Sequence, residues 1–322
     1  MRRRPRLFLT RHIFAVLMAG MLAVVFGCTQ NEPDSPSSSP TQTAAVQSGQ
    51  EPSSGPRFAQ VPPVSDPAQP KVKTVVIDAG HGGDEVGAAR NGVVEKLSNL
   101  DMAFRVEALL KEQGVRVVLT RREDTRVSFA GATGGPGTGF TSARVDLQSR
   151  VDIANAERAD IFLSIHSNGS SDEGQRGVEV WYDGLRPFAD KNARFARMIL
   201  NDVLVELDAI GYSALNRGIQ DDSCWRSRND RCFQLFILGP ERETTSTEVA
   251  QRGGNPADFG LGPQRTSFNT RATSMPGALA ELLFISNVSD NAMLRSDTAR
   301  DAMARGLVRA LMEFLASEGS NA

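Results

Sequence analysis

Apolar residues in this chain follow two spacings, short continuous runs and longer repeats every three or four positions. Continuous runs rich in β-branched residues are typical of buried strands, whereas the longer repeats are typical of helices with one apolar side. The runs predict strands at residues 74–78, 115–120, 161–165, 177–182, 233–238 and 278–285. Strands that read as continuous apolar runs favour a parallel sheet that is buried on both faces.

Helical repeats lie between these runs. The first has apolar residues at positions 100, 104, 109 and 110 and ends at Gly114. The predicted helices cover residues 98–113, 145–157, 188–208 and 290–315. This order of strands and helices predicts the α/β fold class, as a single domain with a twisted, mainly parallel sheet covered by helices on both faces.

Three stretches follow neither spacing. Residues 28–70 are rich in Ser, Pro, Gln and Gly, and a disordered tether is predicted there because so few apolar residues cannot offset the entropy of ordering. Residues 128–142 contain five glycines, which predicts an irregular loop. Residues 221–274 are long and polar, and loops of that length are usually functional. The predicted folded domain therefore spans residues 71–318, with 221–274 as an insert.

The first 27 residues are typical of an export signal. They contain five arginines and no acidic residue, and their apolar stretch at positions 13–26 is short for a membrane span. The end of this stretch, Val25-Phe26-Gly27-Cys28, resembles a bacterial lipoprotein box. The resemblance implies that Cys28 becomes the lipidated first residue and anchors the exported protein to a membrane. The alternative is an ordinary secretory signal with an incidental cysteine.

Charge and cysteine content restrict the partners and the compartment. Removal of the signal leaves 31 of the 36 Lys and Arg against all 38 Asp and Glu, a formal net charge of −7. An acidic chain disfavours nucleic acid as a partner, because the phosphate backbone favours basic surfaces. Cys224 and Cys232 remain as an isolated pair in an oxidising compartment, which predicts a local disulfide. The alternative is two buried thiols.

Two histidines occupy equivalent places, each at the end of a predicted strand. His81 closes the run that begins at Thr74, and His166 closes the run that begins at Ile161. The remaining histidine, His12, lies in the export signal. Carboxyl ends of parallel strands meet at one edge of the sheet, where ligands bind, so two imidazoles there predict a metal site. The alternative is a pair of polar residues that cap the strand ends.

Acidic residues supply two further parts of such a site. A third metal ligand is needed, and spacing leaves Asp84, Glu85 and Glu95 open, although a helix predicted after Glu95 could fix its position. Glu281 lies inside the apolar run 277–285, where an unpaired carboxylate costs several kcal/mol. A carboxylate kept there suits a general base beside a metal, and the alternative is an ion pair with an arginine at the sheet edge.

Several motifs that run in order along the chain carry a family resemblance. They are Asp78-Ala79-Gly80-His81-Gly82-Gly83, Glu95-Lys96 with Asn99-Leu100, Leu119-Thr120-Arg121, Arg150 with Ile153-Ala154-Asn155, Phe162 to Asn168, and Met275 to Glu281 with Phe284, Ser286-Asn287 and Asp290. Together they span roughly residues 71–315 and resemble the zinc-dependent N-acetylmuramoyl-L-alanine amidases of bacterial cell walls, the amidase 3 class.

The resemblance implies one Zn²⁺ held by His81, Glu95 and His166, with Glu281 as the catalytic carboxylate. It implies hydrolysis of the amide between N-acetylmuramic acid and L-alanine in peptidoglycan, for cell wall remodelling and cell separation. An exported lipoprotein that faces the periplasm or the cell wall is expected. The sequence identifies no protein activator.

Other features of the chain qualify this resemblance. Asp78 and Arg121 also match motif positions, and we expect them to orient the ligands. The insert 221–274 is longer than the usual connection, and we expect it to rim the substrate, stiffened by the disulfide. Leu283 stands where glycine or alanine is frequent. The alternative functions are another zinc amide hydrolase, such as a peptidase of the stem peptide, and a non-catalytic wall-binding lipoprotein.

Overall fold

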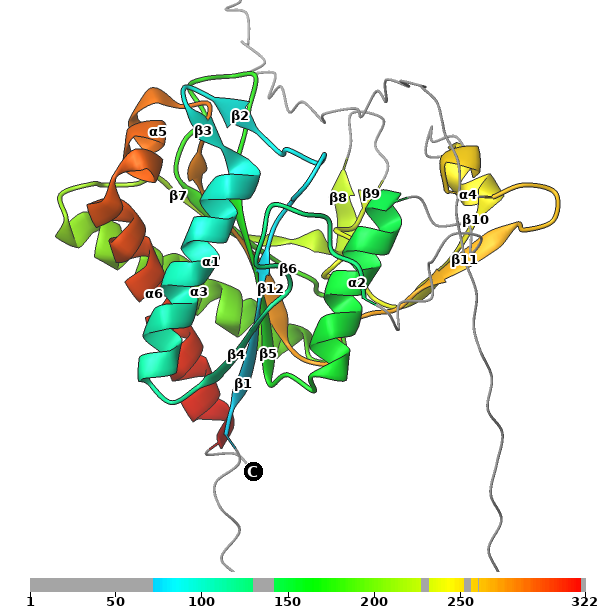
Figure 1. Cartoon of the computed structure of the whole chain (residues 1–322), viewed down its shortest axis with the longest axis horizontal. Coiled ribbons are helices and arrows are strands. Elements are labelled where there is room, and N and C mark those ends of the chain that lie inside the picture. The colour runs from blue at the N-terminus through cyan, green and yellow to red at the C-terminus, as the bar shows by residue number, and fades with distance from the viewer. Residues whose placement is uncertain (1–71, 130–141, 227–231, 252–255, 260, 320–322) are drawn as a thin grey trace, which may run out of the picture. The chain divides into compact units, whose positions relative to one another are not determined.

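A six-stranded sheet forms the centre of the folded domain (Figure 1). The computed structural model describes residues 72–319 except 130–141, 227–231, 252–255 and 260. In spatial order the strands are β4 (Arg116–Leu119), β1 (Thr74–Ala79), β5 (Ile161–Asn168), β12 (Gly277–Phe284), β6 (Val178–Tyr182) and β7 (Asn216–Asp221). Neighbouring strands are parallel except that β6 runs antiparallel to β12. The predicted α/β class with a mainly parallel sheet is therefore confirmed.

Helices cover both faces of this sheet, as Figure 1 shows. One face carries α1 (Glu95–Glu112), α3 (Ala189–Ala209), α5 (Val288–Arg295) and α6 (Asp297–Gly319) over the larger hydrophobic core. The opposite face carries α2 (Ser142–Ala156), whose Val151 and Ala154 pack with Val76 and Phe162 in a second core. Side chains of β1, β5 and β12 alternate between the two cores, because successive residues of a strand point to opposite faces.

Most of the predicted elements match the structure closely, but several elements differ or were not predicted. Residues 233–238 were predicted as a strand, which is wrong. Only Cys232–Phe233 forms a short strand, β9, and Ile237 and Leu238 are buried in a turn. The predicted helix 290–315 is two helices, α5 and α6, separated at Ser296. The edge strand β7 was not predicted, because Ile219 is the single apolar side chain in its sequence Asn-Arg-Gly-Ile-Gln-Asp.

The insert 221–274 leaves the sheet at the end of β7 and returns at β12. The register places Gln220 beside Trp181, and Trp181 beside Leu279 near the start of β12. Both ends therefore lie at the edge of the sheet where β5 and β12 begin. Within the insert, β8 (Trp225–Arg226) pairs with β9, and β10 (Arg242–Thr245) pairs with β11 (Ser267–Thr270), while α4 (Ser246–Gln251) follows β10.

Polar contacts fasten this insert to the domain. Asn155 of α2 donates to the carbonyl of Ala272 at 2.9 Å and accepts from the amide of Ser274 at 2.7 Å. The buried Arg186 donates to the carbonyls of Leu238 and Thr273, so one guanidinium joins two parts of the insert that are distant in sequence. The expected position of the insert at the rim of the substrate stays a prediction.

Some expectations fall outside the part of the chain that the structure describes. These are the signal 1–27, the tether 28–70 and most of the glycine-rich loop 128–142. The side chains of Cys224 and Cys232 are also outside it, so their disulfide stays a prediction. Across the residues that are described, no helix is both long enough and apolar enough to cross a membrane.

Asp290 joins three parts of the fold by hydrogen bonds, and its replacement should destabilise the protein. This fully buried carboxylate accepts hydrogen bonds from the amides of Gly177 and Phe284, at 2.7 and 2.8 Å, and from the Tyr212 hydroxyl. Asp290→Ala leaves these donors unpaired, so we expect the free energy of unfolding to fall by about 2–4 kcal/mol in urea titrations. The exposed ion-pair partner Asp301 provides the control, since its replacement by Ala should cost less than about 1 kcal/mol.

Candidate metal centre

His81 lies at the carboxyl end of β1, in a backbone conformation that residues other than glycine rarely adopt. Its φ is 62°, in the left-handed region, and Gly82 and Gly83 that follow also have positive φ. Arg150 donates to the carbonyl of His81 at 2.7 Å and Arg121 donates to that of Gly80 at 2.9 Å. These bonds hold the turn that aims the His81 ring along the edge of the sheet.

His166 approaches His81 from β5, the next strand of the sheet. The two ring centroids are 4.8 Å apart with an interplanar angle of 74°. A Cβ atom at Gly80 would lie 2.2 Å from the His166 ring, so only glycine permits this approach. The structure therefore confirms that the two predicted strand ends bring the two imidazoles together.

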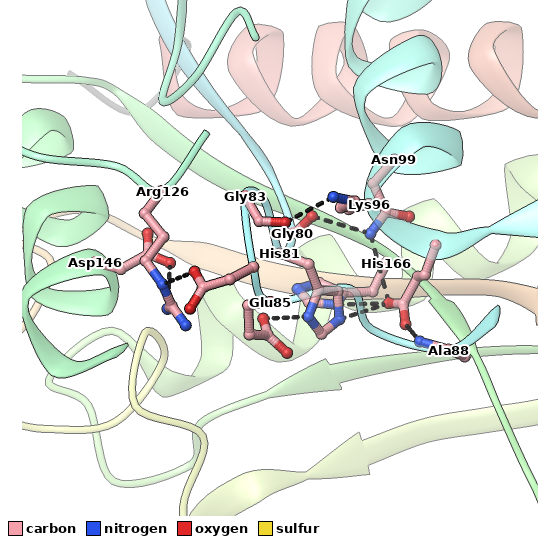
Figure 2. Close-up of polar contacts among 12 residues, drawn as sticks. Gly80, His81, Gly83, Glu85, Ala88, Lys96, Asn99, Arg126, Asp146 and His166 are labelled. Atoms are coloured by element: carbon pink, nitrogen blue, oxygen red, sulfur yellow. Dashed lines mark hydrogen bonds and ion pairs between the residues drawn. The ribbon is translucent and has the colours of Figure 1, made fainter. Parts of the chain in front are cut away.

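Glu95 completes a cluster of three potential ligands. It is the first residue of α1, it is almost fully buried, and its Oε2 accepts from the amide of Ala88 at 2.7 Å. Its Oε1 lies 2.8 Å from His81 Nε2 and 3.1 Å from His166 Nδ1. One potential ligand atom from each of the three residues lies within 4.8 Å of the others. Figure 2 shows the His81 and His166 rings close together at this point.

The electrostatics of this cluster fit a divalent cation. Burial lowers the pKa of His81, but hydrogen bonds and charges from Glu85 and Glu95 outweigh it and raise that pKa to about 10. Burial would raise the pKa of Glu95, but the two histidines hold that pKa well below its usual range. The carboxylates of Glu85 and Glu95 therefore favour a positive charge at this position, and two nitrogens with one carboxylate oxygen are a usual donor set for zinc.

The structure distinguishes the three carboxylates that the sequence spacing allowed as a third metal ligand. Glu95 is in the cluster, whereas Glu85 hydrogen-bonds to Nδ1, the nitrogen of His81 that faces away from Glu95 (Figure 2). Asp84 points elsewhere, into an ion pair with Arg126. Glu85 was predicted only as a possible metal ligand, so its contact with the far side of the His81 ring was not foreseen. A carboxylate behind a ligating imidazole fixes the tautomer and orientation of the ring.

Glu281 lies between two paired residues on the neighbouring strands, and the three together form a row across the sheet. It is opposite His166 on β5 and opposite Glu179 on β6. Its Oε2 is enclosed and has no hydrogen-bond partner among the residues described. Burial, together with the negative charges of Glu95 and Glu179, raises the pKa of Glu281 well above its usual value. No arginine forms an ion pair with it in the described part of the chain, so the carboxylate is available to a ligand.

Asp78 and Arg121 lie beneath the cluster without joining it. Asp78 accepts from Thr120 Oγ1 at 2.6 Å, from Ser164 Oγ at 2.7 Å and from Arg150 Nη1 at 2.8 Å. Arg121 donates to the backbone carbonyls of residues 79, 80 and 96. Arg150 is a motif residue for which the sequence suggested no role. Its position on the buried side of a predicted helix, four residues after Asp146, was the signal for a buried ion pair.

Comparisons with known proteins show which family the chain resembles. A family profile described as N-acetylmuramoyl-L-alanine amidase matches residues 75–313. The germination-specific N-acetylmuramoyl-L-alanine amidase of Bacillus subtilis is 25% identical over 248 residues, which are 77% of this chain and 81% of that protein. The N-acetylmuramoyl-L-alanine amidase AmiA of Escherichia coli is 25% identical over 250 residues, which are 75% of this chain and 76% of that protein.

A solved structure has a similar fold. The N-acetylmuramoyl-L-alanine amidase AmiC2 of Nostoc punctiforme is similar with a TM-score of 0.51 and 26% sequence identity. The similarity covers 76% of this chain and 97% of that one. The family profile itself begins inside β1 and spans the other five strands of the central sheet.

Replacement of Glu85 should weaken metal binding through His81. Glu85→Ala removes the acceptor that fixes the His81 ring, so we expect the affinity for Zn²⁺ to fall about 10- to 100-fold in chelator-competition titrations. Asp84→Ala is the matched control, because this neighbouring carboxylate pairs with Arg126 and should leave the affinity unchanged. Equal affinities of the Glu85→Ala variant and the wild type would contradict the orienting role.

Proposed function

This chain belongs to the amidase 3 family of N-acetylmuramoyl-L-alanine amidases, and on that premise we propose that it hydrolyses the amide bond between N-acetylmuramic acid and L-alanine in bacterial peptidoglycan. The observation that carries the proposal is the convergence of His81, Glu95 and His166 beside the unpaired carboxylate of Glu281. A carbonyl placed at the three ligand atoms would lie next to this carboxylate. That arrangement suits hydrolysis of an amide.

The chain's own residues supply the metal ligands and the proton transfers. His81, Glu95 and His166 would hold the zinc ion, which when bound polarises the scissile carbonyl and lowers the pKa of water. Glu281 takes a proton from the attacking water and then delivers a proton to the nitrogen as the C–N bond breaks. The products are a lactyl carboxylate on the sugar and a free α-amine on L-alanine.

The environment of Glu281 suits this double role. Its pKa is raised by burial and by the nearby negative charges of Glu95 and Glu179, so the carboxylate gains a proton readily. The enclosed Oε2 has no competing hydrogen bond among the described residues. A base with these properties can accept a proton in one step and donate it in the next.

Replacement of Glu281 should abolish hydrolysis without loss of the metal. Glu281→Gln keeps the shape of the side chain but cannot accept the proton, so turnover of purified muropeptides should fall by a factor of about 10² to 10⁴. Bound zinc, measured by elemental analysis, should stay near one per chain. Glu206→Gln is a control, since this carboxylate pairs with Arg305 and Arg309 on the helical face.

Product analysis in the same assay distinguishes the alternatives. A free lactyl carboxylate with an intact peptide supports an amidase, whereas cleavage inside the stem peptide would indicate a peptidase. Unchanged turnover in the Glu281→Gln variant would reject the mechanism. Absence of hydrolysis by the zinc-loaded wild type would favour a wall-binding protein instead.

We further propose that the protein is exported and held at a membrane by a lipid on Cys28. The support comes from the sequence, in which a basic and apolar start ends at Gly27-Cys28 and a polar segment follows. A chain of about 43 residues between Cys28 and the domain has an average span of roughly 35 Å if it is flexible. Such a tether would let the catalytic domain reach peptidoglycan near the membrane.

Replacement of Cys28 should release the protein from the membrane. Cys28→Ser removes the thiol to which the lipid would attach, so we expect the full chain to move from the detergent phase to the aqueous phase in phase partitioning. The wild type should stay in the detergent phase, because several acyl chains bind far more stably than one. A wild-type protein recovered in the aqueous phase, with an unmodified N-terminus by mass spectrometry, would contradict the anchor.

A further inference from the structure

Arg217 is a partly exposed cation at the end of the row that contains His166, Glu281 and Glu179. It lies on β7, at the level of Glu179 on β6, and Glu179 lies opposite Glu281 on β12. Arg217 Nε donates to Glu179 Oε2 at 2.7 Å, and Arg217 Nη1 donates to Gln175 Oε1 at 3.0 Å. The side chain is 25% exposed, whereas that of Glu179 is 10% exposed. The guanidinium is therefore held in place at the end of the row, beside solvent.

The guanidinium of Arg217 packs against β12, the strand that carries Glu281. Its Cζ lies 4.8 Å from the centre of the Phe284 ring, and Phe284 is the last residue of β12. A planar guanidinium on an aromatic face is a stable arrangement, and it fixes the direction of the remaining N–H groups. The charge of Arg217 therefore lies over Phe284, which follows Glu281 by three positions on β12.

A β-bulge in β12 places the Phe284 ring on this side of the sheet. Glu281 is opposite His166 and Phe284 is opposite Asn168, so three steps along β12 match two along β5. The extra residue lets Leu282 and Leu283 both join the core on the α1, α3 and α6 side. Leu283 has a φ of 66°, so the change in backbone direction occurs at this residue. Phe284 then lies outside that core and under Arg217.

Arg217 retains hydrogen-bond donors that no described residue uses. Nε and one hydrogen of Nη1 are taken by Glu179 and Gln175, and Nη2 has no partner in the described part of the chain. Glu179 is also held by Asn168 at 2.8 Å, so its charge is shared between two donors. A planar guanidinium with free N–H groups is a good partner for a carboxylate.

We propose that Arg217 binds a carboxylate of the stem peptide, namely the free α-carboxylate of the residue that follows L-alanine. This inference rests on the proposed function. Arg217 is then a residue that determines substrate specificity, and it distinguishes stems with a free carboxylate from stems in which that group is amidated. Phe284, Glu179 and Gln175 hold the guanidinium in position for this contact.

Distances along the chain and along the substrate agree. Three residue steps lead from Glu281 to Phe284, which is roughly 10 Å or less because the bulge shortens the rise. One extended residue spans about 3.5 Å, so a carboxylate on the second stem residue lies roughly 7 Å from the scissile carbonyl carbon. A substrate whose carbonyl sits beside Glu281 can therefore reach the guanidinium on Phe284 with its second residue.

The test compares two substrates on the zinc-loaded, full-length protein. These are N-acetylmuramoyl-L-alanyl-D-isoglutamate, with the free carboxylate, and N-acetylmuramoyl-L-alanyl-D-isoglutamine, in which it is amidated. We expect the wild type to prefer the first by about tenfold or more in kcat/KM, mainly through KM. In the Arg217→Gln variant this ratio should fall to about one. Both rates come from one preparation, so a loss of folded protein cancels in the ratio.

Arg194→Gln is the matched control. Arg194 also stacks on a phenylalanine, with its Cζ 5.0 Å from the Phe314 ring centre, and pairs with a glutamate, Glu318, but it lies between α3 and α6. This variant should keep the wild-type ratio. A wild type that hydrolyses both substrates equally, or an Arg217→Gln variant that loses activity equally on both, would overturn the inference. Hydrolysis of neither substrate by the wild type would instead reject the proposed amidase function.

Discussion

The buried ion pair between Asp78 and Arg150 is the interaction on which the rest of the site depends. Two charges buried away from water cost several kcal/mol each unless hydrogen bonds compensate for the lost solvation. Here Asp78 accepts hydrogen bonds from Thr120, which follows β4, and from Ser164 of β5, and Arg150 donates to Asp146 and to the carbonyl of His81. One pair thereby connects β1 with the strands on either side of it, helix α2 and the turn that carries His81.

That connection explains how the turn at His81 tolerates its backbone conformation. A non-glycine residue in the left-handed region costs roughly 1–2 kcal/mol, and His81 is such a residue. Arg121 and Arg150 donate to the backbone of residues 79 to 81, so the turn is held from below by two guanidinium groups. The cost in backbone energy is offset by bonds that the folded core makes in any case, and the imidazole gains a fixed direction.

Much of the fold and site could be predicted from the sequence, for reasons that differ between residues. His81 and His166 were predictable because parallel strand ends meet at one edge, and Glu281 because a lone charge in an apolar run is costly. Glu95 could be selected only through the family resemblance, since the path from His81 depends on several positive φ angles. The edge strand β7 was missed because it is half-exposed and polar. The run 233–238 was taken for a strand, since a buried turn and a buried strand have the same apolar composition.

The bulge at Leu283 connects the hydrophobic core to the outer face of the site. Leu283 is fully buried and has a backbone angle that suits glycine, so its side chain and its backbone have opposing preferences. Packing must hold the leucine in place for Phe284 to keep its orientation under Arg217. A change of side-chain volume in the core near Leu283 would therefore be transmitted to the surface. Substrate preference in this protein can then drift through substitutions at core positions that never touch a substrate.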